Sequence, residues 1–264
     1  MIRPTCEDTF IIKKINLKND YYSLTFQAYS RVNQCKPGYF IQLQLPSRDI
    51  FFRRPMSIAN VSIDTKEIEV IFKIFGYGTK VLSQLQIGDC VNILGPLGVS
   101  FKFPRKSEKV IIIAGGVGFP PLLYLVSEMV KKNYNPDNIE FFYGGKSKGD
   151  ILVRNRIKKT GVNFHPVTED GSFGSKGLIT ERVEKYIKDK NKSKMRIYGC
   201  GPVGMLKVVN ELALRNNISG QISLEAPMPC GIGICLGCVV PLTKGGYARV
   251  CHEGPVFNIG EVAL

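Results

Sequence analysis

The sequence predicts a small antiparallel β-barrel, then an α/β domain with a doubly wound parallel sheet, then a C-terminal segment without a regular pattern. Three observations support this fold class. Residues 1–103 contain short strand-like runs separated by glycine and proline turns, with no long helical pattern. Residues 104–225 alternate apolar runs with amphipathic helical stretches. Residues 226–264 are rich in glycine and contain four of the eight cysteines of the chain.

The length and composition are those of an ordinary globular protein. With 264 residues, of which 44% are hydrophobic and 22% charged, the chain is long enough for two compact domains or one domain with an appended segment. Residues Met1–Asp8 lack the apolar core of a secretory signal, and the most apolar run, Val110–Ala114, is too short to span a bilayer. We therefore expect a cytoplasmic protein that is not inserted in a membrane.

The net charge of +14 arises from 36 Lys and Arg residues against 22 Asp and Glu residues. A net positive charge favours binding of a nucleic acid, an acidic partner or an anionic ligand. The lysines are dispersed, for example at Lys13-Lys14, Lys131-Lys132 and Lys158-Lys159, and do not form a stripe interleaved with aromatic residues. We therefore expect solvated surfaces and no nucleic-acid binding.

The barrel prediction rests on strands between recognisable turns. Strand-like runs occupy residues 10–12, 22–26, 40–45 and 67–75, and glycine or proline breaks fall at 36–38, 45–47, 76–78 and 95–98. A short helix is expected after Thr79, because Val81, Leu82 and Leu85 share one helical face.

The α/β prediction begins with the apolar run 109–114, which is bounded by glycines as expected of a buried parallel strand. Further strands are expected at 139–143, 162–167, 194–198 and 220–224. The helices between them are expected at about 121–132, 150–159, 179–188 and 202–216. Such alternation predicts a parallel sheet, whose ligands bind at the carboxyl ends of the strands.

The cysteine spacing is the most specific chemical signal: Cys230-x4-Cys235-x2-Cys238-x12-Cys251. The first three match the C-x4-C-x2-C run of plant-type [2Fe-2S] ferredoxins, and four thiolates suffice for two tetrahedral irons. The glycines between the ligands let the loop wrap closely and direct backbone N–H groups at the sulfurs. A structural zinc site usually pairs two C-x2-C motifs, and this sequence has one. A zinc site and unliganded thiols remain alternatives. Because residues 226–264 show little periodicity, we expect the cluster to hold this segment in shape.

A flavin site is predicted in the barrel. Arg54-Pro55-Met56-Ser57 lies at the end of a strand, where a guanidinium reaches a diphosphate and a hydroxyl reaches a flavin edge. Gly76-Tyr77-Gly78-Thr79 then opens a short helix, and its backbone N–H groups suit an anion. Either motif alone also fits a structural turn; the two in this order favour FAD.

A nucleotide site is predicted at two strand-to-helix turns. Gly115, Gly116 and Gly118 follow the first parallel strand, where a dinucleotide phosphate binds, although the turn is not a G-x-G-x-x-G motif. Cys200, Gly201 and Pro202 follow a later strand at the same sheet edge. Cys200 either faces the nicotinamide or is a small buried thiol. Since no Ser-His-Asp grouping or paired-carboxylate pattern is present, we assign no catalytic residue.

Several of these motifs, in the same order, resemble the ferredoxin-NADP reductase superfamily: Arg54-Pro55-Met56-Ser57, Gly78-Thr79, Gly95-Pro96-Leu97-Gly98, Gly115-Gly116-Val117-Gly118 and Cys200-Gly201-Pro202. The C-terminal stretches 229–238 and 250–257 narrow the resemblance. They are similar to the electron-transfer subunits of NAD-linked (class B) dihydroorotate dehydrogenases, and the resemblance covers nearly the whole chain.

This resemblance implies that dihydroorotate is oxidised on a separate FMN-containing catalytic subunit, in pyrimidine biosynthesis. Electrons then cross a [2Fe-2S] cluster on Cys230, Cys235, Cys238 and Cys251 to FAD, and leave as hydride to NAD+. Two copies of each subunit form a heterotetramer. By motif position the FAD contacts are Arg54, Pro55, Met56, Ser57, Ile71, Phe72, Lys73, Gly78 and Thr79. A flavin suits this task because it exchanges both single electrons and hydride.

Two other readings remain open. Reductase subunits of bifurcating NAD(P)H:ferredoxin oxidoreductases and of sulfide dehydrogenases share these domains, although their first cluster ligand can be Asp, so Cys230 favours the dihydroorotate family. A zinc-stabilised nucleotide-binding module is the alternative outside redox chemistry. The sequence does not decide between NAD and NADP.

Overall fold

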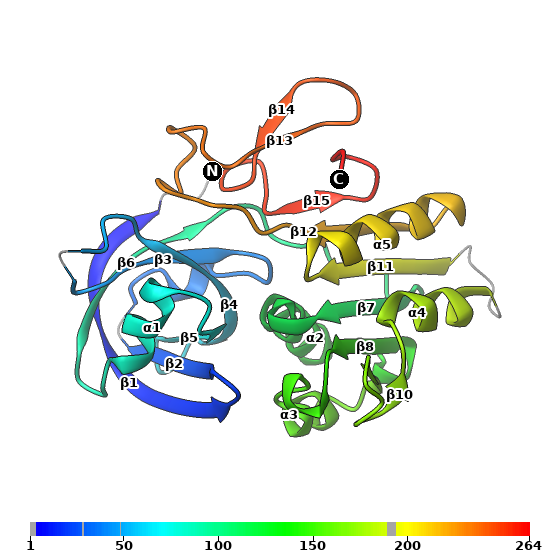
Figure 1. Ribbon diagram of the computed structural model, residues 1–264, viewed down its shortest axis with the longest axis horizontal. Helices are drawn as coiled ribbons and strands as arrows, with labels where there is room; N and C mark the ends of the chain where they lie inside the picture. Colours follow the sequence, from blue (N-terminus) through cyan, green and yellow to red (C-terminus); the bar gives the residue numbers. More distant parts are fainter. Residues whose placement is uncertain (1–3, 28, 48, 189–193) are drawn as a thin grey trace.

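The computed structural model describes residues 4–27, 29–47, 49–188 and 194–264; Met1–Arg3 of the N-terminal stretch considered above lie outside them. The barrel and the α/β sheet lie side by side, and the C-terminal segment runs along the top of both (Figure 1). The fold class predicted from the sequence is confirmed.

The N-terminal barrel is closed in the order β1-β2-β5-β4-β3-β6, with antiparallel pairing throughout. Its strands are β1 Thr5–Lys18, β2 Tyr21–Gln27, β3 Phe40–Gln44, β4 Arg54–Ser62, β5 Glu67–Lys73 and β6 Cys90–Leu97. The arginine motif was predicted at the end of a strand, but Arg54 begins β4. The predicted helix is α1, Tyr77–Gln84, and Leu82 and Leu85 pack in the barrel core while Val81 stays partly exposed.

The α/β domain has the sheet order β10-β9-β8-β7-β11-β12-β15. Its strands are β7 Lys109–Gly115, β8 Ile139–Gly145, β9 Asn163–Thr168, β10 Ser175–Lys176, β11 Met195–Cys200 and β12 Ser219–Ser223. The helices are α2 Phe119–Lys131, α3 Arg154–Lys159, α4 Ile179–Lys188 and α5 Val203–Arg215. Strands β7 to β12 pair in parallel, as predicted.

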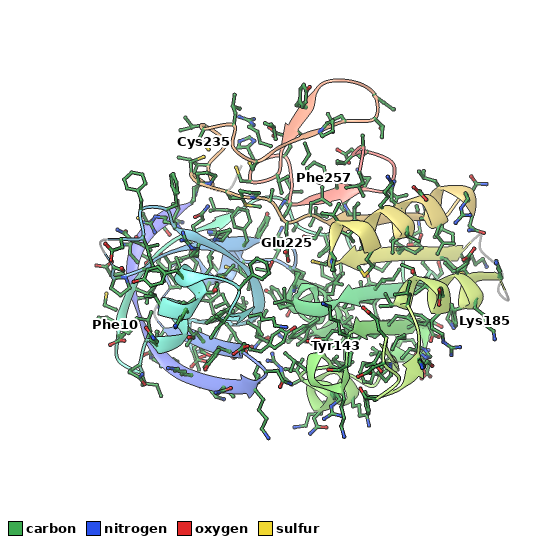
Figure 2. All side chains as sticks on the ribbon, in the orientation of Figure 1. Phe10, Tyr143, Lys185, Glu225, Cys235 and Phe257 are labelled. Carbon is green, nitrogen blue, oxygen red and sulfur yellow. The ribbon has the colours of Figure 1, made fainter. Side chains whose placement is uncertain are left out.

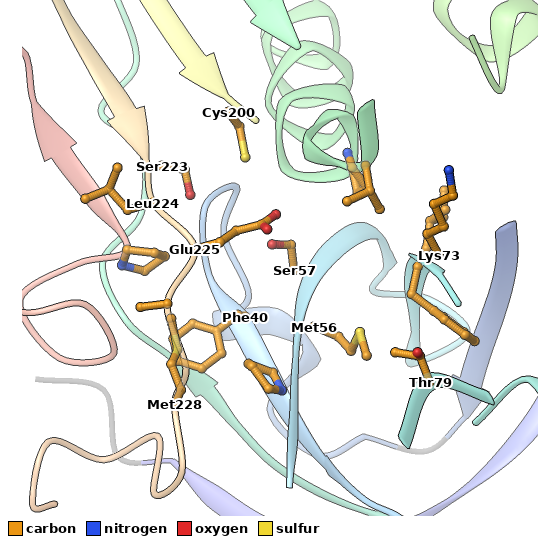
Figure 3. Close-up of a pocket in the computed structure, with 17 residues that line it drawn as sticks. Phe40, Met56, Ser57, Lys73, Thr79, Cys200, Ser223, Leu224, Glu225 and Met228 are labelled. Atoms are coloured by element: carbon orange, nitrogen blue, oxygen red, sulfur yellow. The ribbon is translucent and has the colours of Figure 1, made fainter. Parts of the chain in front are cut away.

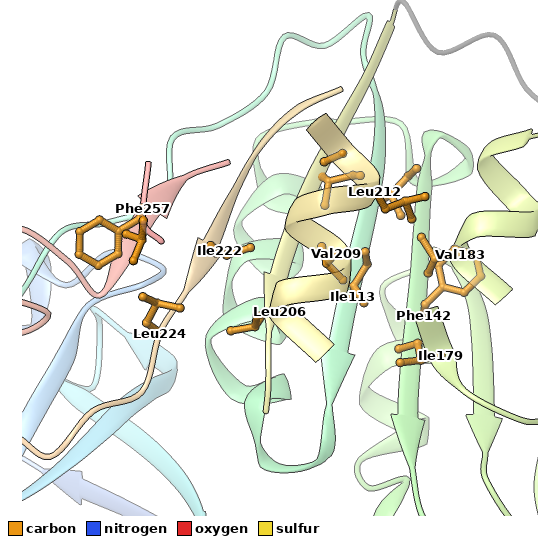
Figure 4. Packing of buried hydrophobic residues seen from close by; sticks show 14 of the residues in the cluster. Ile113, Phe142, Ile179, Val183, Leu206, Val209, Leu212, Ile222, Leu224 and Phe257 are labelled. Carbon is orange, nitrogen blue, oxygen red and sulfur yellow. The ribbon is translucent and has the colours of Figure 1, made fainter. Parts of the chain in front are cut away.

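The helices cover both faces of this sheet because strand side chains alternate between its faces. Ile112 of β7 belongs to the core that includes α2 and α3 residues. Its neighbour Ile113 belongs to the core formed with α4 and α5 (Figure 4). This alternation fixes the register of β7 between two apolar layers.

The C-terminal segment contains more regular structure than its lack of periodicity predicted. Strand β15, Val256–Asn258, pairs antiparallel with β12, and the hairpin strands β13, Val239–Pro241, and β14, Tyr247–Arg249, pair with each other. Phe257 is buried in the α/β core. The sheet therefore anchors this segment, through a strand too short to stand out in the sequence.

Contacts between the barrel and the α/β domain are specific. Glu69 of β5 accepts hydrogen bonds from both terminal nitrogens of Arg156 of α3, at 2.9 and 2.8 Å. The Tyr124 hydroxyl of α2 donates to the Cys35 carbonyl at 3.1 Å. These bonds fix the relative position of the two domains. Within the described residues, no helix is long and apolar enough to cross a membrane.

Candidate functional site

A cavity of about 230 Å³ lies where the barrel meets the α/β domain (Figure 3). The sequence-predicted flavin residues that line it are Pro55, Met56 and Ser57 of β4, Ile71, Phe72 and Lys73 of β5, and Thr79 of α1. Cys200, predicted from the nucleotide turn, lines it from the other domain. The structure thus brings flavin and nucleotide motifs, distant in sequence, to one space.

Arg54 and Gly78 do not line this cavity but contact each other beside it. A Cβ at position 78 would overlap the Arg54 guanidinium, with Cζ only 2.8 Å away, so a larger residue here would displace the guanidinium from its present position. The turn before α1 is ordered by Thr79, whose Oγ1 accepts from the backbone N–H groups of Phe75 and Gly76 at 2.8 and 3.1 Å. A guanidinium next to a helix-opening turn suits a diphosphate.

The neighbouring Arg53 has a different role. Its guanidinium donates to the Asn92 side chain at 2.6 Å and to the Gln44 side chain at 3.0 Å. These bonds tie β4 to β6 and β3 within the barrel. Of the two adjacent arginines, Arg54 is the one positioned beside the predicted diphosphate turn.

The two predicted nucleotide turns pack against each other at the carboxyl ends of β7 and β11. A Cβ at Gly118 would collide with the Cys200 carbonyl, and one at Gly115 would lie 2.9 Å from Pro202. Gly201 packs on Gly115 in turn, whereas Gly116, at φ +53°, faces open space. The glycines thus permit a close backbone approach, and Gly116 leaves room for a ligand.

Cys200 is a buried thiol, as one of the two alternatives from the sequence had it. Its thiol is buried, and this burial raises the pKa well above the ordinary cysteine value. It nevertheless contributes to the cavity wall. It is a neutral, protonated thiol at the nucleotide side of the cavity.

Sequence reasoning missed the side of the cavity formed after β12. Ser223, Leu224, Glu225, Ala226 and Met228 all line it. The Glu225 carboxyl is directed toward the space between Ser57 and Cys200 (Figure 3), and the surrounding protein atoms raise its pKa. Its position just past the last parallel strand was the available signal, because ligands bind at that sheet edge.

The four predicted cluster cysteines lie in the C-terminal segment as two pairs. The Cys235 thiol lies beside Cys230, and the Cys251 thiol lies beside Cys238. Cys235 is at the outer edge of the segment (Figure 2), whereas Cys238 and Cys251 are buried. Among the described residues, no three His, Cys, Asp or Glu side chains converge as ligands of one metal ion. Two pairs of thiols fit two irons better than a single zinc ion.

Backbone amides point at these sulfurs. Gly237 N–H donates to Cys235 Sγ and Cys251 N–H to Cys238 Sγ, both at 3.4 Å. Burial opposes ionisation of Cys230, but the amides of the surrounding loop outweigh it and lower the thiol pKa to about 6. Burial and the adjacent Cys238 raise the pKa of Cys251 to about 12. Of the four thiols, Cys230 is therefore favoured to ionise and bind a cation, whereas ionisation of Cys251 is opposed.

Arg249 joins the two halves of the cysteine segment. Its Nη1 donates to the Gly233 carbonyl at 2.8 Å, between the first two cysteines, and Glu253 holds the guanidinium in an ion pair. Gly233 itself has φ +80° and packs against His252, so the loop turns tightly here. Arg249 therefore fixes the loop of Cys230 and Cys235 onto the turn that contains Cys251.

Comparison with known families agrees with this division of the chain. The oxidoreductase FAD-binding domain matches residues 9–103, and the oxidoreductase NAD-binding domain matches residues 112–211. The iron-sulfur cluster binding domain of dihydroorotate dehydrogenase B matches residues 225–263.

Curated relatives extend over nearly the whole chain. The electron transfer subunit of dihydroorotate dehydrogenase B (NAD(+)) from Shouchella clausii is 34% identical over 260 residues, which is 96% of each chain. Those from Desulforamulus reducens and Fusobacterium nucleatum are 35% and 32% identical, over 92% and 98% of each chain. The chain belongs to the family of dihydroorotate dehydrogenase B electron transfer subunits. The resemblance inferred from the sequence motifs is confirmed.

Solved structures agree with the fold of this electron transfer subunit family. The NADH-dependent reduced ferredoxin-NADP oxidoreductase aligns with a TM-score of 0.85 at 23% identity, covering 97% of this chain and 89% of the other. A ferredoxin reductase of carbazole 1,9a-dioxygenase aligns with a TM-score of 0.71 at 19% identity, covering 82% and 67%. The cofactor set predicted from the sequence, FAD, NAD and an iron–sulfur cluster, is confirmed by the matched domain families.

Proposed function

We propose that the chain transfers electrons from a separate FMN-containing catalytic subunit, which oxidises dihydroorotate to orotate, to NAD+. Overall, dihydroorotate and NAD+ become orotate, NADH and a proton, in the pathway to UMP. FAD supplies hydride exchange with nicotinamide and single-electron exchange with an iron–sulfur cluster. The observation that best supports this function is that the chain runs directly from the cavity to the cluster loop. Met228 lines the cavity, and Cys230, two residues later, is the first cluster cysteine.

The barrel residues would bind and orient FAD. Arg54 and the turn at Gly78 and Thr79 suit the diphosphate, because a guanidinium and backbone N–H groups favour anionic oxygens. Ser57 offers a hydroxyl to the flavin edge inside the cavity. Pro55, Met56, Ile71, Phe72 and Lys73 would form the remaining contacts.

The α/β residues would present NAD+ from the opposite wall. Gly116 leaves room for the nucleotide phosphates, Gly115 and Gly118 let the two turns approach closely, and Gly201 with Pro202 shapes the adjoining turn. Cys200 contributes a neutral thiol to the same wall. The Glu225 carboxyl, whose pKa is raised because the surrounding protein atoms shield it from water, lies near Ser57 on this wall.

The C-terminal cysteines would bind the [2Fe-2S] cluster, one iron on each pair. The segment that carries the exposed Cys235 also exposes apolar side chains: Ile232, Ile234, Leu236, Val239 and Tyr247 are 41%, 75%, 59%, 44% and 75% exposed. A contiguous exposed apolar surface is typical of a protein interface. The catalytic subunit would dock here, next to the cluster, in an assembly of two copies of each subunit.

Two structural expectations accompany this function. We propose domain limits of 1–103, 104–225 and 226–264, which follow the change from barrel to parallel sheet and then to the cysteine segment. We also propose a cytoplasmic location, consistent with the free, buried thiols of Cys35 and Cys200.

Purification of the tagged chain from its host tests the assignment. We expect a flavin spectrum with broad cluster absorption, co-purification of an FMN subunit, and dihydroorotate-dependent formation of NADH. Recovery of a large ferredoxin-type subunit without dihydroorotate oxidation would contradict the partner. A colourless, zinc-containing protein would contradict the redox function itself.

A further inference from the structure

Gln42 is a polar residue in an apolar position between the barrel and the cysteine segment. In β3, Ile41 and Leu43 point into the barrel core. Their neighbour Phe40 points outward and packs in the cluster that contains Cys238 and Cys251. Gln42 lies on this outer face and has an exposed fraction of 0%.

The Gln42 side chain contacts the segment that leads to the first cluster cysteine. Its Nε2 donates to the Met228 carbonyl at 2.8 Å. Gly231 packs against the same amide so closely that a Cβ there would overlap Nε2. Gln42 thus touches the chain on both sides of Cys230, while its own backbone carbonyl accepts a 3.4 Å hydrogen bond from Arg53.

The hydrogen bonding of this amide is incomplete. Among the described residues Gln42 Oε1 has no hydrogen-bond partner. A buried, unpaired polar atom destabilises the folded chain, and an apolar side chain of similar size would avoid that cost. Stability alone therefore does not account for glutamine at this position, whereas a directed bond to Met228 does.

We propose that Gln42 is a positioning residue that sets where residues 226–231 lie between the flavin cavity and the cluster. Met228 lines the cavity, and Cys230 begins the cluster loop. The bond from Gln42 to Met228 and its packing against Gly231 therefore hold the chain on both sides of Cys230. Gln42 thereby controls the rate of electron exchange between FAD and the cluster. Gln42 does not contact the nicotinamide turns, so hydride transfer does not depend on it.

The inference rests on the proposed function, and its test separates the two. The holoenzyme is mixed anaerobically with NADH, and the flavin and cluster absorption bands are followed separately by stopped flow. Gln42→Met removes the hydrogen bond while preserving length, and Gln42→Asn retains the amide but shortens its reach. Gln44→Met is the matched control, because Gln44 lies on the same face of β3 but is exposed. Visible circular dichroism reports the cluster environment independently of turnover.

Both Gln42 variants are expected to retain FAD and iron, with a wild-type rate of flavin reduction. Their cluster reduction is expected to be several-fold slower and the cluster dichroism altered, with Gln44→Met unchanged in both. A wild-type cluster rate and dichroism in Gln42→Met, or full recovery in Gln42→Asn, would overturn the proposal. Loss of both cofactors would also overturn it, since Gln42 would then support folding in general. Absence of cluster reduction in the wild-type holoenzyme would instead contradict the proposed function.

Discussion

The flavin cavity and the cysteine segment are built in different ways. The cavity walls come from β4, β5 and the ends of parallel strands, whose positions are fixed by sheet hydrogen bonds and by apolar cores on both sides. The cysteine segment has only short strands, β13, β14 and β15, and tight turns at positive φ at Gly231 and Gly233. One site is shaped by regular structure, the other by local turns and by a few side-chain bonds.

This difference indicates how each site depends on its cofactor. The cavity residues are held in place by strands that also form the barrel, so the shape persists without FAD. The pair Cys230 and Cys235, of which only Cys235 is exposed, has no regular structure around it and relies on Arg249 and the buried pair. We therefore expect a substitution that damages one site to leave the other site intact.

Replacement of a cluster ligand should have the largest effect. Cys235→Ser removes a soft thiolate from the exposed pair, so the cluster should be lost while FAD remains bound in the barrel. Iron analysis and the visible spectrum measure both cofactors in one sample. Cys90→Ser is the matched control, because Cys90 is an exposed cysteine on β6, outside the cysteine segment. Loss of FAD together with iron would show that the two sites are coupled.

Replacement of the diphosphate arginine should have the reverse effect. Arg54→Ala removes charge-assisted hydrogen bonds and should weaken FAD binding by about 10- to 100-fold, with normal iron content. Flavin dissociation constants measured by fluorescence check this. Arg53→Ala serves as the comparison: it should lower the melting temperature instead, since Arg53 bonds to Asn92 and Gln44. Unchanged flavin affinity in Arg54→Ala would remove this residue from the site.

Loss of the arginine in the cysteine segment should have a smaller effect. Arg249→Ala breaks the bond to the Gly233 carbonyl, so the loop of Cys230 and Cys235 should open more often. We expect several-fold faster bleaching of the cluster by an iron chelator and unaltered flavin content. Arg249→Lys, which retains the charge but not the planar geometry, should be intermediate. Wild-type bleaching in Arg249→Ala would show that the cysteines hold the loop unaided.

The smallest change is expected far from both cofactors. Burial disfavours ionisation of Glu140, but hydrogen bonds from His165, Lys109 and Tyr186 outweigh this and lower its pKa to about 2. Because the folded pKa lies below the unfolded value, the carboxylate stabilises the protein above about pH 4.5, and this contribution disappears as the pH falls through about 2.

Glu140→Gln should therefore reduce the dependence of the melting temperature on pH across that acid range, and leave both cofactors bound at neutral pH. Melting curves at several pH values test it, with Glu184→Gln, a half-buried carboxylate on α4 paired with Lys188 in an i,i+4 contact, as control. A slope equal to that of the wild type would indicate that other carboxylates dominate acid unfolding.

The sequence predicted what depends on local patterns. The alternating residues around Leu24 predicted the barrel, and the apolar run from Val110 predicted the parallel sheet. The cysteine spacing was enough to predict a metal site. Glu225, Gln42 and β15 were not found, because their roles arise only when residues far apart in the chain meet. Val256 and Phe257 form too short a run to indicate a strand, and a buried glutamine has no distinctive sequence signature.

We propose that FAD and the cluster in this one chain exchange electrons with each other and with NAD. Anaerobic titration of the purified complex with NADH, followed by electron paramagnetic resonance, tests it most directly. We predict flavin bleaching together with the signal of a reduced [2Fe-2S] cluster, and in Cys235→Ser flavin bleaching without that signal. Flavin reduction in the wild type with no cluster signal would contradict the account.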